Sequence, residues 1–302
     1  MRIGVSLASH HDVDDHHLGA RWMIERSRAA ASAGLDVLSV GDHHAVGTPY
    51  YQNVPMVGRM LAEWPSERPV GCLFLLPLWH PVLVAEQVGT LAAIHGGTFA
   101  IQTGLGGGAQ QFAAMGRELG RRVGDLVESI RLIRALLDGE TVSSDRFGIH
   151  AAVVSPRPPG DVEWWIGARA EVALRRAAAL RGSWYAGPEL TTEAARRLLA
   201  LFLDACAAAG HEPQRLAVRR DVLVADTDAE AQRLAGPVIA GGHRGFDSDA
   251  LSIGSPETVA DRFAVLAEIG FTDVVARQLP VPQDMAVGSI ARLAEVRRLL
   301  TA

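Results

Sequence analysis

The chain contains no lysine, because all 29 of its basic residues are arginines. Schiff-base aldolases, pyridoxal-phosphate enzymes and P-loop nucleotidases all need a lysine amine, so these classes are excluded. Cysteine is almost as scarce. Cys72 and Cys206 lie far apart and in no metal-ligand spacing, so we expect two buried thiols and no disulfide.

Two further absences limit the partners of the protein. No run of about 18 apolar residues could span a bilayer, and a formal charge of −5 gives no basic surface for nucleic acid. Residues 1–7 enter a strand-like run without the apolar stretch and cleavage site of a signal peptide. We therefore expect a soluble cytoplasmic protein that acts on a small molecule, with no nucleic-acid or membrane partner.

Strand-like and helix-like segments alternate along the whole chain. Apolar runs predict strands at 2–8, 35–40, 70–76, 98–103, 162–166, 183–186, 216–224 and 271–276. Apolar residues at i, i+3, i+4 and i+7 predict helices at 19–33, 54–63, 81–95, 117–137, 170–181, 192–208, 228–235, 256–269 and 289–300. Strict alternation with eight repeats predicts an α/β fold, a (β/α)8 TIM barrel. No linker divides residues 1–302, so we expect a single domain with insertion loops at 138–160 and 236–254.

The second predicted strand ends in a group of polar side chains. Asp42, His43 and His44 directly follow its apolar residues. Because the carboxyl ends of parallel strands face the site in such proteins, Asp42 and His43 are candidate catalytic residues, and His44 is a candidate substrate contact. The alternative is an ordinary turn in which Asp42 caps the next segment and the histidines are solvated.

Two glycine-bearing strand ends are candidates for binding a phosphate. The run 103–109 formally fits a dinucleotide fingerprint but lacks the acidic residue at the end of the following strand. Its glycines still leave backbone amides accessible, and the run 164–170 opens a helix, whose amino terminus favours anions. A solvated charge is the alternative for the arginine of this second run. The candidate residues are Gly104, Gly106, Gly107, Gly167, Ala168 and Arg169.

Two other strand ends carry weaker signals. The third strand is apolar to its very end, where it could back a planar ring or simply form barrel core. After the first strand, Ser9 is a candidate substrate contact. The segment 10–17 that follows is rich in histidine and aspartate, but it lacks the i, i+4 histidine spacing of a helical zinc site. We expect a solvated loop there and no metal.

Several short motifs occur together at 40–44, 80–91, 94–99, 104–106, 133–140, 165–167 and 254–260. In combination they resemble the luciferase-like flavin-dependent oxidoreductase superfamily, which includes bacterial luciferase and the F420-dependent dehydrogenases and reductases. The resemblance covers nearly the whole chain. It implies a barrel that binds a flavin or F420 at its carboxyl-end face, with the phosphate at the two glycine turns.

The resemblance also implies roles for individual residues. His43 matches the family's active-site histidine, which acts in proton transfer or stabilises a flavin intermediate. The pair Asp42 and His43 is shared with F420 enzymes, whereas the doubled histidine resembles the luciferase branch. A non-proline cis peptide is implied near Leu73 and Phe74, where it would push the strand against the cofactor ring. Such a bond costs about 3 kcal/mol.

The chain departs from the family pattern at two places. Many members have Asp-Gly-Trp where this chain has the run 181–184, Arg-Gly-Ser-Trp. An arginine or tyrosine commonly follows the fourth-strand glycines, where this chain has Gly107 and Gly108. Phosphate binding would then depend more on backbone amides and on Arg169.

The leading hypothesis is an oxidoreductase that uses reduced FMN, supplied by a partner reductase, to activate O2 and insert one oxygen atom into a small organic substrate. The alternatives are F420-dependent hydride transfer and a catalytically silent flavin-binding subunit. A metal-dependent barrel hydrolase using the segment 10–17 is a further alternative. The family analogy also suggests a homodimer. Barrel loops carry no readable code for the substrate.

Overall fold

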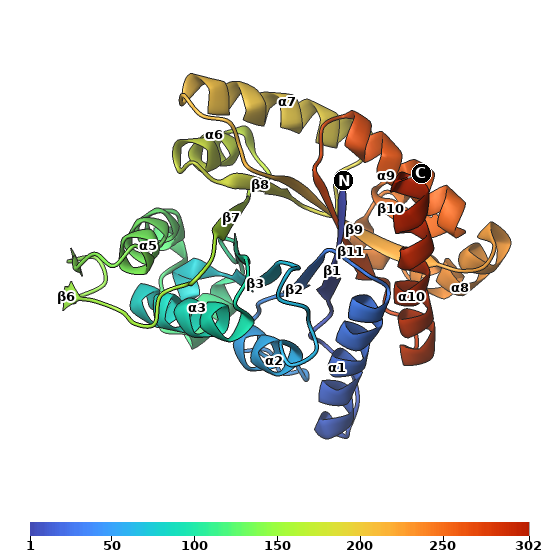
Figure 1. The fold of residues 1–302 in the computed structure, drawn as a ribbon, viewed down its shortest axis with the longest axis horizontal. Coiled ribbons are helices and arrows are strands. Elements are labelled where there is room, and N and C mark those ends of the chain that lie inside the picture. The colour runs from blue at the N-terminus through green and yellow to red at the C-terminus, as the bar shows by residue number, and fades with distance from the viewer. Residues whose placement is uncertain (302) are drawn as a thin grey trace.

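The computed structural model describes residues 1–301, and these contain the predicted closed barrel. Within them, eight parallel strands pair in the cyclic order β1-β2-β3-β4-β7-β8-β9-β11, and pairing of β11 with β1 completes the ring. All eight predicted strands are confirmed, and the helices surround them (Figure 1). The barrel strands are β1 (Arg2–Leu7), β2 (Val37–Val40), β3 (Val70–Phe74), β4 (Phe99–Thr103), β7 (Val162–Gly167), β8 (Ser183–Ala186), β9 (Leu216–Val224) and β11 (Asp273–Gln278).

Local capping explains where several helices begin. The side chains of Asp15, Thr191, Thr227 and Ser255 each accept a hydrogen bond from a backbone amide in the first turn of the following helix. The short α4 was not predicted from the sequence, and the last helix begins at Gln283, six residues before the predicted start at 289. The helices are α1 (His16–Ser32), α2 (Asn53–Met60), α3 (Pro81–His95), α4 (Ala109–Ala114), α5 (Arg122–Leu137), α6 (Glu171–Ala179), α7 (Thr192–Ala208), α8 (Asp228–Ala240), α9 (Pro256–Glu268) and α10 (Gln283–Thr301).

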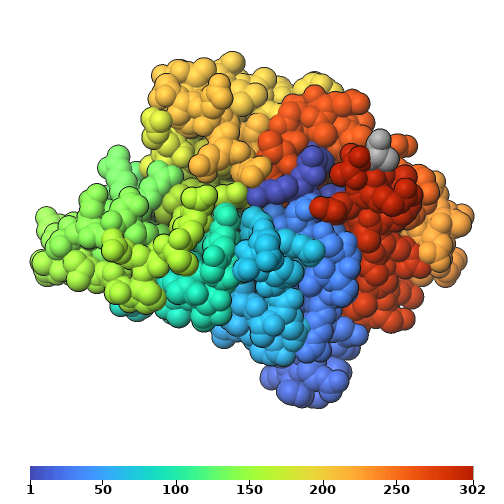
Figure 2. Space-filling view, viewed as in Figure 1, coloured from blue at the N-terminus to red at the C-terminus, as the bar shows by residue number. Residues whose placement is uncertain are grey.

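The two insertion loops contain more regular structure than the sequence indicated. The first forms an antiparallel hairpin, β5 (Val142–Ser144) with β6 (Ile149–Ala152), in the green region at the left end of the molecule (Figure 2). In the second, α8 continues past Pro237, and β10 (Leu251–Gly254) pairs in parallel with the carboxyl half of β9. β9 is longer than its pairing with β8, so β10 covers the part of its edge that extends beyond the barrel.

The amino-terminal end of the barrel is filled and closed. Trp165 is fully buried and packs in the interior with Val37, Ala100, Ala217 and Val275. On the amino-terminal side of Trp165, four charged side chains form ion pairs with one another: Arg2, Glu163, Arg215 and Asp273. Trp165 and these ion pairs therefore separate the barrel interior from the hollow that Arg2, Glu163 and Arg215 line at this end.

The cysteines and the helices bear on two expectations from the composition, which concern disulfides and membrane spans. Cys72 and Cys206 are both buried and free, as predicted, and burial raises the pKa of each thiol. Within residues 1–301, no helix contains a stretch that is long and apolar enough to cross a membrane.

Candidate active site at the carboxyl-terminal end of the barrel

Asp42 is buried at the end of β2, where it connects this strand to the end of β3. Its Oδ2 accepts hydrogen bonds from the backbone amide of Leu75 (2.7 Å) and from Nε1 of Trp79 (2.8 Å). Its Oδ1 lies 3.0 Å from Nε2 of His44, which is also buried. Asp42 therefore holds neighbouring strand ends and His44 in place, and its oxygens are turned toward protein groups.

His43 is more exposed than its two neighbours, and Gln111 of α4 determines its tautomer. Nε2 of Gln111 lies 2.8 Å from Nδ1 of His43 and donates to the backbone carbonyl of His44 at 2.9 Å. A carbonyl can only accept, so the amide nitrogen must face this segment, and Nδ1 of His43 must be the acceptor. In the neutral ring the proton is then on Nε2.

The same contact keeps the His43 ring neutral. If the ring were protonated, its Nδ1–H would point at the NH2 group of Gln111, which cannot accept a hydrogen bond. Burial lowers the pKa of His43, and the neighbouring His44 lowers it further, although Asp42 acts in the opposite direction. His43 is therefore a neutral hydrogen-bond donor through Nε2.

The end of β3 supplies an apolar wall, but with a different pair of side chains than predicted. Side chains alternate along a strand, and Leu73 and Leu75 both approach Gly104 of the neighbouring strand end. Phe74, predicted to contact the cofactor, is fully buried on the opposite face and packs edge-on against Trp79.

The implied non-proline cis peptide near Leu73 and Phe74 is not found. Within residues 1–301, the only cis bond precedes Pro156. The Leu73 carbonyl accepts a hydrogen bond from the side chain of the buried Asn53, with all peptides of this strand trans. The trans form of a non-proline peptide is favoured by about 3 kcal/mol, and the strand adopts it throughout.

The glycine turn after β4 lies beside this apolar wall. A Cβ atom at Gly104 would come within 3.1 Å of the Leu75 side chain, and Gly106 has a positive φ of 66°. A Cβ atom at Gly107 would meet nothing within 4 Å. The turn therefore exposes backbone next to open space, as a phosphate site requires.

The second predicted phosphate turn lies at the end of β7, next to β4 in the barrel. A Cβ atom at Gly167 would lie 2.8 Å from the Thr103 carbonyl, so only glycine fits this close approach. Ala168 is buried, and its carbonyl accepts from Nε1 of Trp184. Arg169 is exposed and forms an ion pair with Glu189 at 2.8 Å, so an incoming phosphate would compete with that carboxylate.

Ser9 is buried at the end of β1, and the nearby Tyr50 was missed by the sequence analysis. Burial is the main cause that raises the pKa of Tyr50, and its other perturbing groups include Ser9, Asp42 and Arg277. The Tyr50 ring lies 5.7 Å from the His43 ring. Neither Tyr50 nor Gln111 belongs to a recognisable motif: Tyr50 follows His43 by seven residues in the same loop, and tertiary structure brings Gln111 of α4 to it.

The segment 10–17 does not assemble a metal site. Asp15 caps α1 through the amide of His17, and His11 is buried against Trp22 and Tyr51, whereas His10 and His16 are exposed. Within residues 1–301, no group of three or more histidine, cysteine, aspartate or glutamate side chains could hold a metal ion.

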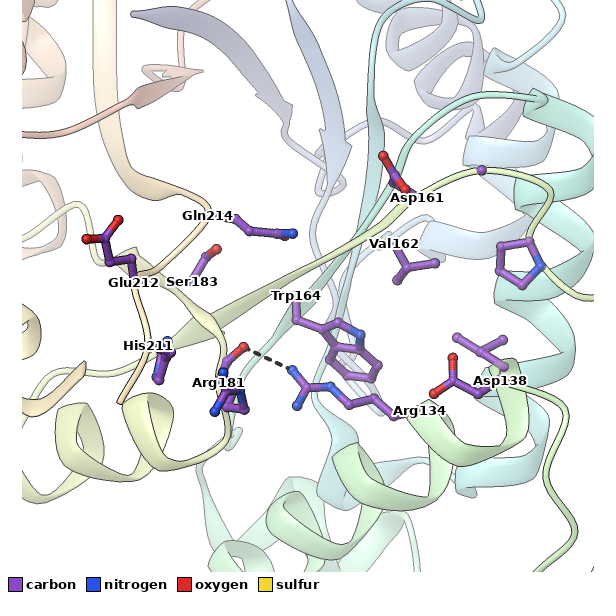
Figure 3. Close-up of a pocket in the computed structure, with 13 residues that line it drawn as sticks. Arg134, Asp138, Asp161, Val162, Trp164, Arg181, Ser183, His211, Glu212 and Gln214 are labelled. Atoms are coloured by element: carbon purple, nitrogen blue, oxygen red, sulfur yellow. Dashed lines mark hydrogen bonds between the residues drawn. The ribbon is translucent and has the colours of Figure 1, made fainter. Parts of the chain in front are cut away.

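A hollow of about 610 Å³ lies at the other end of the barrel, beside the starts of β7 and β8 (Figure 3). Arg134, which lines it, is already engaged with protein groups. Arg134 stacks 4.8 Å from the Trp164 ring centroid and donates to the carbonyls of Leu180 and Arg181. In barrels of this type the amino-terminal end serves stability, so this hollow is not the active site.

A model of the luciferase-like monooxygenase family matches residues 1–251 of the chain. The chain belongs to this family. Uncharacterised proteins of Mycobacterium tuberculosis and Mycobacterium bovis are 30% identical over 114 residues, which is 37% of this chain and 40% of each relative. The chain thus matches about two fifths of the length of these curated relatives.

Solved structures with the luciferase-like fold superpose on nearly the entire chain. Monooxygenase RslO1 from Streptomyces bottropensis has a TM-score of 0.85 and 16% identity, with both chains fully covered. The oxygenating constituent of 3,6-diketocamphane monooxygenase from Pseudomonas putida, in complex with FMN, has a TM-score of 0.79 and 19% identity, with 97% of each chain covered. An F420-dependent secondary alcohol dehydrogenase has a TM-score of 0.78 and 16% identity, covering 99% of this chain and 98% of its own. At these identities the similarity establishes the fold.

Unpaired polar atoms at the carboxyl-terminal end fit a cofactor of this kind. Ser9 Oγ, Gln102 Nε2, Gln111 Oε1 and both side-chain polar atoms of Gln278 are buried and have no hydrogen-bond partner within residues 1–301. Buried polar atoms are normally paired, so a ligand with several hydrogen-bonding groups would satisfy them. A flavin or deazaflavin ring offers such groups on its polar edge and an apolar face for Leu73 and Leu75.

Proposed function

We propose that the protein is a monooxygenase that uses reduced FMN from a separate reductase, together with O2, to oxidise a small organic substrate. When bound, the reduced flavin supplies the electrons that activate O2. Leu73 and Leu75 would lie against the ring, and the turns at Gly104, Gly106 and Gly167 would hold the phosphate through backbone amides.

The fixed tautomer of His43 is the observation that supports oxygenation best. Gln111 occupies Nδ1, so the ring offers an Nε2–H donor toward the site and no free acceptor. A neutral donor stabilises a developing oxyanion without delivering its proton prematurely. The buried Asp42 and His44 keep the segment rigid, and the apolar wall excludes water from the reacting atoms.

F420-dependent hydride transfer is the second candidate, because an F420-dependent alcohol dehydrogenase shares the fold. Oxidation of an alcohol requires a base that accepts the hydroxyl proton. In the tautomer that the Gln111 contact favours, Nε2 already carries a proton, so His43 could act as that base only after it loses this contact. This requirement makes the candidate the weaker one.

Separate titrations with FMN and with F420 test the proposal, with tryptophan fluorescence and cofactor absorbance as readouts. We expect tighter binding of FMN. A clear preference for F420 would favour hydride transfer, and binding of neither cofactor would contradict the proposed function.

The role of His43 is tested by replacing it in the FMN-loaded protein. His43→Ala should retain FMN affinity and lower substrate-dependent O2 consumption by about 100-fold, a typical value for a catalytic proton donor. His17→Ala, which removes an exposed histidine on α1, is the matched control. Unchanged turnover of His43→Ala with FMN bound would assign the histidine a structural role.

A further inference from the structure

A cavity of about 430 Å³ opens at the carboxyl-terminal end of the barrel, on the side formed by β9 and β11. Its lining includes Trp22, Arg26, Asp221, His243, Arg244 and Arg277. The volume is within the usual range for small-molecule sites. Basic groups are unusually frequent in it, since three arginines contribute to one small cavity.

These arginines have too few acidic partners. Asp221 is buried and serves three basic groups: Nε2 of His243 at 2.9 Å, Nε of Arg219 at 3.4 Å and Nη1 of Arg244 at 3.5 Å. Arg277 is half-buried, and the three ion pairs of Asp221 within residues 1–301 do not include it. Asp12, the second carboxylate that lines the cavity, is exposed and belongs to none of the ion pairs within residues 1–301, and the nearby Glu189 is already paired with Arg169. The cavity therefore retains excess positive charge.

The fold explains why these residues converge. Ala217 and Val275 point into the barrel interior, so Arg219, Asp221 and Arg277, at alternate positions along the same strands, point there as well. Arg244 comes from the insertion loop before β10. It has a positive φ of 52°, and its guanidinium also lies 4.8 Å from the Phe246 ring centroid.

The electrostatics agree with a site that lacks its anion. Burial and the nearby guanidiniums of Arg219 and Arg244 together lower the pKa of Arg277 to about 10, although Asp221 acts in the opposite direction. A half-buried cation close to other cations is costly, and a bound anion would reduce that cost. Tyr50 connects this cavity to the catalytic segment, because Arg277 and Asp42 both influence its hydroxyl.

We propose that the substrate carries an oxyanion, a carboxylate or a sulfonate, which Arg244 and Arg277 bind in this cavity while the reacting carbon lies toward His43. This inference rests on the proposed function, because it names the substrate class of the same site. Guanidinium groups suit such anions, since their planar donors match pairs of carboxylate or sulfonate oxygens.

A cofactor phosphate is the other possible source of an anion, and the topology argues against it. In the cyclic strand order β11 is four strands from β4 in either direction, so Arg277 lies opposite the glycine turn that follows β4. A flavin with its phosphate at that turn would have its ring between the two sides. The anion at Arg277 then belongs to the substrate.

The test compares methanesulfonate with dimethyl sulfone, an uncharged molecule of nearly the same shape. Ligand-observed NMR titrations at constant ionic strength give the affinities for the wild type, Arg277→Gln, Arg244→Gln and the control Arg175→Gln, which removes an exposed arginine of α6. FMN and riboflavin are titrated into the same four proteins. Arg244 is half-exposed, so its variant remains informative if Arg277→Gln fails to fold.

We expect the wild type and Arg175→Gln to prefer methanesulfonate by at least about tenfold, and both site variants to lose this preference with FMN affinity unchanged. Equal affinity of the wild type for the two probes would overturn the inference. Loss of FMN affinity but not riboflavin affinity in the site variants would also overturn it, because the arginines would then hold the cofactor phosphate. Retained preference for methanesulfonate without binding of FMN or F420 would support the anion site and contradict the proposed function.

Discussion

The two ends of the barrel both bury charged groups, but they use them differently. At the amino-terminal end, Arg2 makes a bidentate contact with Glu163 at 3.1 and 3.2 Å and also pairs with Asp273, while Arg215 contacts Glu163 at 3.3 Å. Two guanidiniums thus face two carboxylates. Glu163 additionally accepts from Nε1 of Trp165, which links the charged layer to the interior.

At the carboxyl-terminal end, two guanidiniums and one imidazole share the carboxylate of Asp221, and several buried amide and hydroxyl atoms lack partners within residues 1–301. A protein pays for such unmet groups in stability unless a ligand satisfies them. The comparison indicates that one end of the barrel is built to fold and the other to bind. Each prediction below tests one side of this contrast.

Removal of Glu163 should have the largest effect on stability. Glu163→Ala leaves Arg2 short of a partner and Nε1 of Trp165 without an acceptor, so we expect a loss of about 3 kcal/mol or more in the free energy of unfolding. Urea denaturation measures this loss. Glu189→Ala, at the opposite end and paired with an exposed arginine, should cost less than about 1 kcal/mol. Similar losses in the two variants would remove the distinction between the ends.

His11 should make stability depend on pH at the binding end. Burial, assisted by Arg26, lowers the pKa of His11 from 6.5 to about 4. Between these values the unfolded chain binds a proton that the folded protein does not, so stability falls as the pH decreases from 6.5 toward 4, by roughly 3 kcal/mol at most.

His11→Gln should flatten this part of the stability profile, whereas His17→Gln should leave it unchanged. Unfolding free energies at pH 7 and pH 4.5 give the comparison. An identical pH dependence in the wild type and His11→Gln would show that the ring is not held neutral by the fold.

Gln111→Leu should affect catalysis more than binding. Without the amide, Nδ1 of His43 is free to carry a proton, so the neutral donor at Nε2 is no longer the only available form. We expect about a tenfold lower turnover with FMN affinity retained, and a shift in the pH profile of turnover. A lower turnover with an unchanged pH profile would indicate that Gln111 acts only through packing.

The sequence predicted the barrel, whereas the side-chain partners of the candidate site could not be predicted from it. Strand periodicity is a local signal, and it correctly identified the eight strands; the site at the ends of β2 and β4, which strand-end polarity indicated, stays a prediction. Gln111 and Arg277 come from parts of the chain far from His43 and Tyr50, and only the closed barrel brings Gln111 to His43 and Arg277 near Tyr50. The direction of Phe74 depends on strand register, which composition does not reveal.

Gly107→Ala should produce the smallest effect and should separate binding from folding at a single position. A Cβ atom there meets nothing within 4 Å, so the free energy of unfolding should change by less than about 0.5 kcal/mol. If the open space beside the turn receives the cofactor phosphate, the methyl group would obstruct it, and FMN affinity should fall several-fold with riboflavin affinity retained. Equal affinities for FMN in the wild type and the variant would mean that the phosphate binds elsewhere at this end of the barrel. A several-fold loss of FMN affinity would show that a methyl group that does not destabilise the fold interferes with the ligand. This result is expected if the carboxyl-terminal end of the barrel binds the cofactor.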